Sequence, residues 1–266
     1  MTQPEPDYDG PLLIAHRGYP FRYPENSAVG VQAAIDAGAR FVEIDVQMSG
    51  DGAAVLLHDA NCQRTAGVDR QVMDLPLARL KELNFNEDAR LGSAYAQVSI
   101  PTLAEFVALV AGAPLDGAFV EVKQQSLERF GIPQVMDRVM TELRSDLQKF
   151  VVISFESAPL EYARSRHGAQ IGWIVNAFSD DDRQRADLMA PQFVFCDHRK
   201  LPRSPQPWPG PWQWTLYSID DPDEAIRLAG WGAGLIETNA IGELLEHPHL
   251  AGGAAAWVPR GGVTKT

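Results

Sequence analysis

The chain has 266 residues, of which 45% are hydrophobic and 22% are charged. This composition can build a sizeable buried core, which excludes a mainly disordered chain. The 23 basic and 35 acidic residues give a formal net charge of −12, and that sign disfavours nucleic acid and anionic membrane surfaces as partners.

Membrane and secretion signals are not visible in the sequence. No hydrophobic run approaches the ~18 residues that cross a membrane, and no basic region precedes the short apolar run near the start. We therefore expect a cytoplasmic protein without stable membrane association. Cys62 and Cys196 lack metal-binding spacing and cannot build a disulfide framework. We expect two buried free thiols, and nothing in the sequence indicates an oligomeric state.

Short runs rich in β-branched and aromatic residues recur along the chain and predict eight strands. Most are continuous apolar runs, which is typical of parallel strands covered on both faces. The predicted strands are Leu12–Ala15, Phe41–Val46, Ala118–Lys123, Phe150–Phe155, Ile171–Val175, Phe193–Cys196, Gln213–Tyr217 and Gly234–Glu237.

Helical patterns lie between these strands. The first runs from Ser27 to Ala37, with a serine at its start and Gly38 just after its end. The others are Glu128–Leu147, Ala158–Arg166, Asp181–Met189 and Pro222–Leu228. The alternation predicts one domain over residues 1–266, a closed (β/α)₈ or TIM barrel. A doubly wound open sheet is the alternative from the pattern alone.

The interval between the second and third predicted strands is longer than one crossover helix needs. It contains an extra strand at Ala53–Leu57, a helix near Leu77–Asn84 and a second helix after Pro101. We interpret residues 58–100, roughly, as a small insertion over one end of the barrel. Later in the chain, the five prolines of Leu201–Pro211 predict an extended loop in place of a helix, and the tail from Gly252 is expected to fray.

Ionisable residues fall within or just after three predicted strands. Burying an unpaired charge costs several kcal/mol in most estimates. Polar residues at the carboxyl ends of barrel strands indicate an active site. The residues are His16 and Arg17 after the first strand, Glu43 and Asp45 in the second, and Glu121 and Lys123 in the third.

Alternation along a strand places Glu43 and Asp45 on one face, and Glu121 and Lys123 also share a face. If both pairs point inward, three carboxylates converge, and they repel one another unless a cation lies among them. Hard oxygen ligands favour magnesium, calcium or manganese over zinc. The alternative is that Lys123 pairs with one carboxylate while Arg17 or solvent neutralises the others.

His16 and His58 each end an apolar run. One neutral and one protonated imidazole near pH 7 form a competent acid–base pair. Arg17 offers a planar fork that suits phosphate. Glu25 and Asn26 lie in a turn that either only caps a helix or positions catalytic or substrate groups. The remaining histidines are expected to have ordinary structural roles; they are His167, His198, His247 and His249.

Taken together, these segments resemble the glycerophosphodiester phosphodiesterase family. Each match is short, but seven occur in the family's order across residues 12 to 215. The matching segments are Ile14–Gly18 (HRG), Pro24–Ser27 (PENT), Val42–Val46 (E-x-D), Asp51–Gly52 with Leu57–Asp59 (DG…HD) and Arg64–Thr65 (RT), Phe119–Lys123 (E-x-K), Ser154–Phe155, and Trp214–Thr215 (WT). One departure is Ile236–Asn239, where members often carry I-T-D-x-P.

The resemblance implies a TIM barrel that hydrolyses glycerophosphodiesters to glycerol 3-phosphate and an alcohol with a divalent cation, Mg²⁺ or Ca²⁺. It implies a small-molecule substrate and an acid–base pair of His16 and His58, and within this pair we assign His16 as base and His58 as acid. The implied metal ligands are Glu43, Asp45 and Glu121, and the implied phosphate contacts are Arg17 and Lys123. We also predict that Glu25, Asn26 and Trp214 bind the substrate. A lipid-directed phospholipase of the C or D type and a noncatalytic phosphoester-binding barrel are the alternatives.

Overall fold

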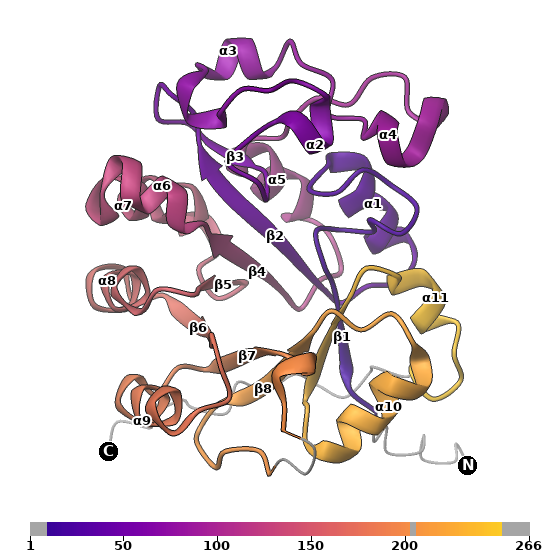
Figure 1. The fold of residues 1–266 in the computed structure, drawn as a ribbon, viewed down its shortest axis with the longest axis vertical. Helices are drawn as coiled ribbons and strands as arrows, with labels where there is room; N and C mark the ends of the chain where they lie inside the picture. The colour runs from indigo at the N-terminus through magenta and orange to yellow at the C-terminus, as the bar shows by residue number, and fades with distance from the viewer. Residues whose placement is uncertain (1–9, 203–205, 252–266) are drawn as a thin grey trace.

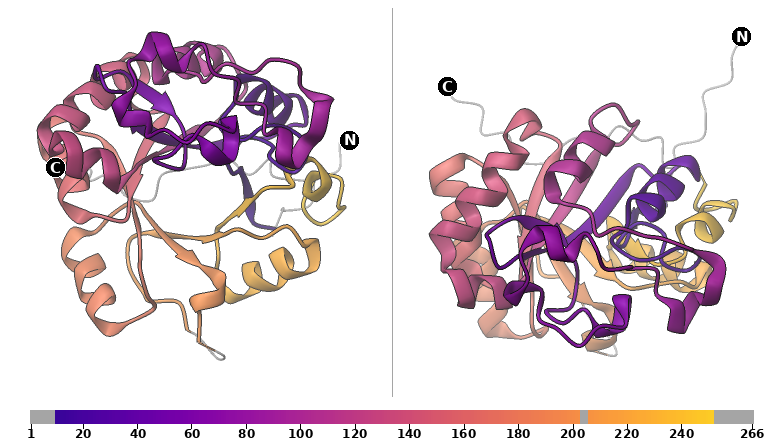
Figure 2. Two further views of the ribbon diagram at one scale, coloured as in Figure 1. Left: turned by 45° about the horizontal axis from the view of Figure 1, so that its top comes forward. Right: turned by 90° about the horizontal axis from the view of Figure 1, so that it is seen from above.

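The computed structural model describes residues 10–202 and 206–251. Its centre is a closed barrel of parallel strands (Figures 1 and 2), because β1 (Leu12–Ala15) pairs with both β2 (Phe41–Met48) and β9 (Leu235–Thr238). The strands between them are β4 (Gly117–Val122), β5 (Phe150–Ser154), β6 (Gln170–Ile174), β7 (Phe193–Asp197) and β8 (Gln213–Tyr217). The predicted TIM barrel is confirmed, and closure excludes the open sheet.

Helices surround the barrel on its outer face (Figure 2). The first begins where predicted, since the Ser27 hydroxyl accepts from the Gly30 N–H at 3.0 Å. The helices outside the insertion are α1 (Ala28–Asp36), α5 (Leu103–Val110), α6 (Gln124–Phe130), α7 (Ile132–Leu143), α8 (Ser157–His167), α9 (Asp180–Met189), α10 (Pro222–Trp231) and α11 (Ile241–Leu245).

The single helix predicted over Glu128–Leu147 is wrong. The chain forms α6 and α7 instead, with Gly131 between them at φ 82°, a conformation that favours glycine. Pro133 in the first turn of α7 suits a new helix start rather than a helix interior. The helix predicted near Leu77–Asn84 is also shorter, ending at Leu80.

The insertion follows β3 (Ala54–Leu56), which pairs antiparallel with β2. It carries α2 (Gln63–Ala66), α3 (Leu77–Leu80) and α4 (Asp88–Leu91). A separate small core holds it together, built by Val55, Leu57, Cys62, Val72, Leu80, Phe85 and Ile100. The segment lies beyond the carboxyl end of β2 (Figure 1), so it can contribute to a site at the barrel mouth.

The lower barrel interior is filled by apolar side chains. Ile14, Phe41 and Phe119 belong to one cluster of inward-facing strand residues, and Phe119 makes edge-to-face contacts with Phe193 and Phe195 at 5.0 and 5.3 Å. This packing closes the lower barrel. A ligand can therefore enter only above these rings, at the carboxyl ends of the strands.

Three further expectations concern the two cysteines, the loop before β8 and the C-terminal tail. Cys62 and Cys196 are buried free thiols, as predicted. Between β7 and β8 the described residues form a short 3₁₀ turn, His198–Lys200, and no α-helix, in line with the predicted loop. The tail from Gly252 lies outside the described residues. No helix in the described part of the chain is long and apolar enough to cross a membrane.

Candidate active site

A cavity of about 450 Å³ lies at the carboxyl ends of the strands. Five of the predicted site residues meet there: His16, Arg17, His58, Glu121 and Lys123. The opposite wall is largely apolar, with polar groups near its top; it is formed by Ile153, Phe155, Ile174, Phe195, Tyr217, His198 and Arg199. The structure thus gathers residues from both halves of the barrel around one space.

Three carboxylates converge at this end of the barrel. Glu43, Asp45 and Glu121 each offer an oxygen within 4.8 Å of the others. Asp45 is the fixed member, because Lys123 Nζ lies 3.0 Å from its Oδ1 and Arg17 Nε lies 3.0 Å from its Oδ2. Lys123 also donates to Glu121 Oε1 at 2.7 Å. The three carboxylates therefore converge as expected. The side chains of Lys123 and Arg17 also pair with part of this cluster, as the alternative expected.

Glu43 lies in the same cluster but forms no ion pair with a lysine or arginine within the described residues. Burial, followed by repulsion from Asp45, raises the pKa of Glu43 well above its ordinary value. Burial alone would also raise the pKa of Asp45, but the charges of Lys123 and Arg17 hold it well below its ordinary range. One oxygen of Glu43, Oε1, is buried and accepts no hydrogen bond. A hard oxygen donor set with an unsatisfied buried oxygen fits a divalent cation.

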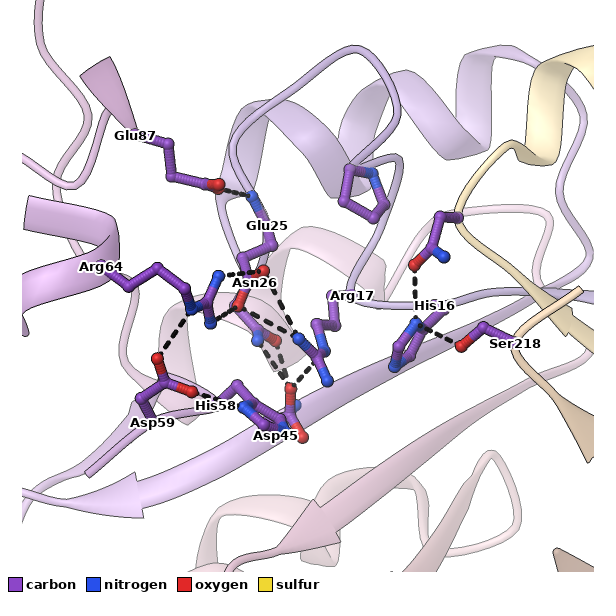
Figure 3. A network of polar contacts seen from close by, with 12 residues as sticks. His16, Arg17, Glu25, Asn26, Asp45, His58, Asp59, Arg64, Glu87 and Ser218 are labelled. Carbon is purple, nitrogen blue, oxygen red and sulfur yellow. Dashed lines mark hydrogen bonds and ion pairs between the residues drawn. The ribbon is translucent and has the colours of Figure 1, made fainter. Parts of the chain in front are cut away.

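His16 is held through its Nδ1, which lies 3.2 Å from the Ser218 hydroxyl (Figure 3). Asn239 Oδ1 lies 2.8 Å from the same nitrogen. The Asn239 amide nitrogen donates to Asp220 Oδ2 at 3.0 Å, which fixes the amide orientation, since a carboxylate only accepts. Nδ1 therefore carries the proton and Nε2 is free, 3.9 Å from Glu43 Oε2. Burial, then the charge of Arg17, lowers the pKa of His16 to about 4, so His16 is neutral at pH 7 and can accept a proton.

A chain of charged groups connects His58 and the insertion to the loop between β1 and α1 (Figure 3). His58 Nδ1 lies 2.7 Å from Asp59 Oδ1. Asp59 accepts from Arg64 Nε at 2.7 Å, and Arg64 binds both oxygens of Glu25 at 2.7 and 2.8 Å. The Glu25 backbone N–H donates to Glu87 at 2.6 Å. The contact at Nδ1 fixes the orientation of the His58 ring and leaves Nε2 as the nitrogen that can exchange a proton with a substrate.

Glu25 and Asn26 do not line the cavity. Asn26 Nδ2 donates to Asp45 Oδ2 at 2.8 Å, and the Asp45 backbone N–H donates to Asn26 Oδ1 at 3.0 Å. Glu25 contacts Arg17 at 3.3 Å. Asn26 and Arg17 both adopt positive φ, 50° and 53°, which is uncommon outside glycine and clusters at functional sites. The turn therefore positions Asp45 and Arg17 in this structure, rather than reaching the cavity itself.

Trp214 is not brought to the site. It is 5% exposed, and its indole N–H donates to the Trp208 carbonyl at 3.2 Å. Its ring packs against Phe178, Trp208 and Trp231 on the outer side of the barrel. Because β8 places Tyr217 inward, alternation turns Trp214 outward. The expected substrate contact at this position is replaced by core packing.

Replacing Trp214 with alanine is expected to reduce the free energy of unfolding by about 3–5 kcal/mol, because a large buried ring is lost from the core. Urea unfolding followed by circular dichroism measures the change. Phe21→Ala is the matched control, since Phe21 is 58% exposed and should change stability little. A Trp214→Ala loss no larger than that of Phe21→Ala would contradict the packing role.

Several cavity residues were not identified from the sequence as site residues. His198 lines the cavity just after β7, although it was expected to be ordinary. Glu237 carries a charge inside a predicted strand, the same signal that identified Glu43. Asn239 follows β9 as His16 follows β1. Position at a strand end could have found all three.

Comparison with known proteins gives one family. The model of the glycerophosphoryl diester phosphodiesterase family matches residues 16–201. A glycerophosphodiester phosphodiesterase of Caldanaerobacter subterraneus is 31% identical over 147 residues, 54% of this chain and 58% of that protein. Human glycerophosphodiester phosphodiesterase 1 is 37% identical over 95 residues, 36% of this chain and 29% of that protein. The aligned segments thus span less than two thirds of these relatives.

Solved structures show the same fold. A phosphodiesterase from Oleispira antarctica, in complex with the product sn-glycerol-3-phosphate, has a TM-score of 0.76 at 23% identity, covering 88% of this chain and 95% of that one. A glycerophosphodiester phosphodiesterase from Thermotoga maritima has a TM-score of 0.66 at 20% identity, covering 88% of this chain and 97% of that one. At these identities the likeness establishes the barrel architecture.

Proposed function

The chain belongs to the glycerophosphoryl diester phosphodiesterase family, and from that premise we propose that it hydrolyses glycerophosphodiesters to sn-glycerol 3-phosphate and an alcohol. The observation that carries the proposal is the convergence of two imidazoles, His16 and His58, beside buried carboxylates in one cavity. The phosphodiesterase from Oleispira antarctica, which binds sn-glycerol-3-phosphate, has the same fold and supports a small-molecule substrate.

Glu43, Asp45 and Glu121 would hold a divalent cation, Mg²⁺ or Ca²⁺. When bound, such a cation neutralises phosphate charge and polarises the P–O bond. The proposal is supported by the unsatisfied Oε1 of Glu43 and by the raised pKa of that carboxyl, since both favour a positive charge at this position.

Arg17 and Lys123 would contact the phosphate from the cavity wall. Asp45 holds both cations at 3.0 Å and therefore keeps them in place before substrate arrives. Preorganised donors stabilise charge that develops on the nonbridging oxygens, because they need no rearrangement during the reaction. Arg17 adds a planar fork that matches two phosphate oxygens.

The two histidines would move the protons. His16 Nε2 takes the proton from the attacking hydroxyl, which belongs either to water or to the substrate's own glycerol. The P–O bond to the alcohol breaks, and protonated His58 gives its proton to the departing oxygen. Attack by the glycerol hydroxyl forms a cyclic glycerol phosphate, which water then opens. Trapping of the cyclic product would identify that route.

The direct test is a panel of glycerophosphodiesters assayed in turn with Mg²⁺, Ca²⁺ and Mn²⁺. We expect release of sn-glycerol 3-phosphate from at least one soluble diester, such as glycerophosphocholine. Vesicles of intact phospholipid form the comparison arm. Hydrolysis of vesicles without hydrolysis of any soluble diester would overturn the proposal in favour of a lipid-directed enzyme. Tight binding of a diester without product would indicate a noncatalytic barrel.

Asn239 is a positioning residue for His16 in this mechanism. Asn239→Ala removes the 2.8 Å contact and is expected to lower kcat about tenfold to a hundredfold with little change in KM. The ¹⁵N chemical shifts of the His16 ring report the tautomer, and the variant should lose the preference for a proton on Nδ1. Ser218→Ala, which removes a longer contact of 3.2 Å, is the control with a smaller expected effect. An unchanged tautomer would contradict the positioning role.

A further inference from the structure

Glu237 is a buried carboxylate at the cavity that the proposed reaction does not use. It lies in β9, is 4% exposed and lines the cavity. Within residues 10–202 and 206–251, no hydrogen bond or ion pair joins its side chain to another group, and the residue lines the cavity. A nearly buried carboxylate at a cavity wall without a protein partner is available to a ligand.

Glu237 adjoins the unsatisfied side of the carboxylate cluster. Its carboxylate lies within 4.8 Å of ligand atoms of His16 and Glu43. Glu43 is also a member of the group formed with Asp45 and Glu121, so it joins the two groups. The buried Oε1 of Glu43 accepts no hydrogen bond. Glu237 is therefore a neighbour of a carboxylate oxygen that lacks a partner.

The positive side chains lie on the other side of the cluster. Lys123 and Arg17 each approach Asp45 to 3.0 Å, so their charge is centred there. With Glu237 included, four carboxylates face two cationic side chains, which leaves two formal negative charges. One divalent cation would supply the two missing positive charges.

We propose that Glu237 is a fourth carboxylate ligand of the cation centre, bound from the Glu43 side. The inference rests on the proposed function, because it requires that a divalent cation occupies this cavity. An added carboxylate raises the negative charge of an oxygen site and so strengthens its binding of Mg²⁺, Ca²⁺ or Mn²⁺. Ile14 pairs with Glu237 across β1 and β9, and barrel closure thus brings the last strand's carboxylate to the ligands of β2.

Calorimetric titration with Mn²⁺ alone tests this role without relying on activity. The wild-type chain is expected to bind one Mn²⁺. Glu237→Gln, which keeps the shape but removes the charge, should weaken the Mn²⁺ affinity at least about tenfold. Glu43→Gln provides the benchmark for loss of a shared ligand, and Glu246→Gln, at an exposed position, should leave the affinity unchanged.

Thermal melting separates ligand loss from misfolding. In chelator, Glu237→Gln and Glu237→Met should melt no lower than the wild type, because each removes an unpaired buried charge. Added Mn²⁺ should then raise their melting temperatures less than that of the wild type. If Glu237→Gln binds Mn²⁺ like the wild type while Glu43→Gln does not, this inference is overturned and the proposed function stands. If the wild type binds no Mn²⁺, both the inference and the cation of the proposed function are wrong.

Discussion

Replacing His16 or His58 with alanine is expected to lower kcat about 10²–10⁴-fold, since each variant loses one proton transfer. In both rings Nε2 is the nitrogen that would transfer the proton. Nδ1 is already engaged, by Asn239 in His16 and by Asp59 in His58. Steady-state hydrolysis of a soluble glycerophosphodiester measures the change. Circular dichroism and urea unfolding establish that each variant remains folded.

The identity of the leaving group distinguishes the two roles. A nitrophenolate leaves without protonation, so a glycerophosphodiester with a nitrophenyl leaving group should largely restore turnover in His58→Ala. The same substrate should not rescue His16→Ala, because His16 acts on the attacking hydroxyl. Rescue of His16→Ala alone would reverse the assignment of acid and base.

His249→Ala is the matched control, as His249 is exposed and lies outside the cavity. It should leave kcat unchanged. Near-normal turnover in either His16→Ala or His58→Ala would remove the acid–base pair from the mechanism. His198 deserves the same assay because it lines the cavity, and a large loss there would place a third imidazole in the reaction.

The barrel could be predicted from the sequence because its strands are continuous apolar runs. The predicted ends of Leu12–Ala15 and Gln213–Tyr217 coincide with β1 and β8. The helix predicted over Glu128–Leu147 was wrong because apolar periodicity continues through Gly131, whereas the backbone there turns at positive φ. Apolar periodicity indicates which side chains are buried. A break in a helix, in contrast, can depend on the backbone conformation of a single residue.

The part of the candidate site that could be predicted from the sequence is the part that alternation within a strand determines. Glu43 and Asp45 share a face of β2, and Glu121 reaches them because Asp45 pairs in register with Glu121. Trp214 lies outside the cavity although the motif predicts a substrate contact there, because alternation along β8 turns Trp214 to the face opposite Tyr217. Glu237 and its neighbours on β9 depend on barrel closure, a contact between the two ends of the chain that no local pattern encodes.

Removal of divalent cations by a chelator is expected to abolish hydrolysis, and re-addition of Mg²⁺ or Ca²⁺ should restore it. Without a cation, the cavity floor holds buried carboxylates in excess of Arg17 and Lys123, and it repels a phosphodiester anion. A bound metal contributes several kcal/mol of charge stabilisation, so the expected loss is at least about 10³-fold. Initial rates across a series of buffered free-cation concentrations measure the dependence.

Two substitutions separate the cation from the side chains that the same cluster holds. Among the described residues, Glu43 forms no ion pair with a lysine or arginine, and His16 Nε2 lies 3.9 Å from its Oε2. Glu43→Gln should therefore mainly weaken cation binding and recover part of its activity at high cation concentration. Asp45 also holds Arg17 and Lys123, so Asp45→Asn should remain impaired at saturating cation. Full activity of the wild type in excess chelator would show that the reaction needs no metal. Equal recovery of both variants would show instead that Asp45 acts only through the cation.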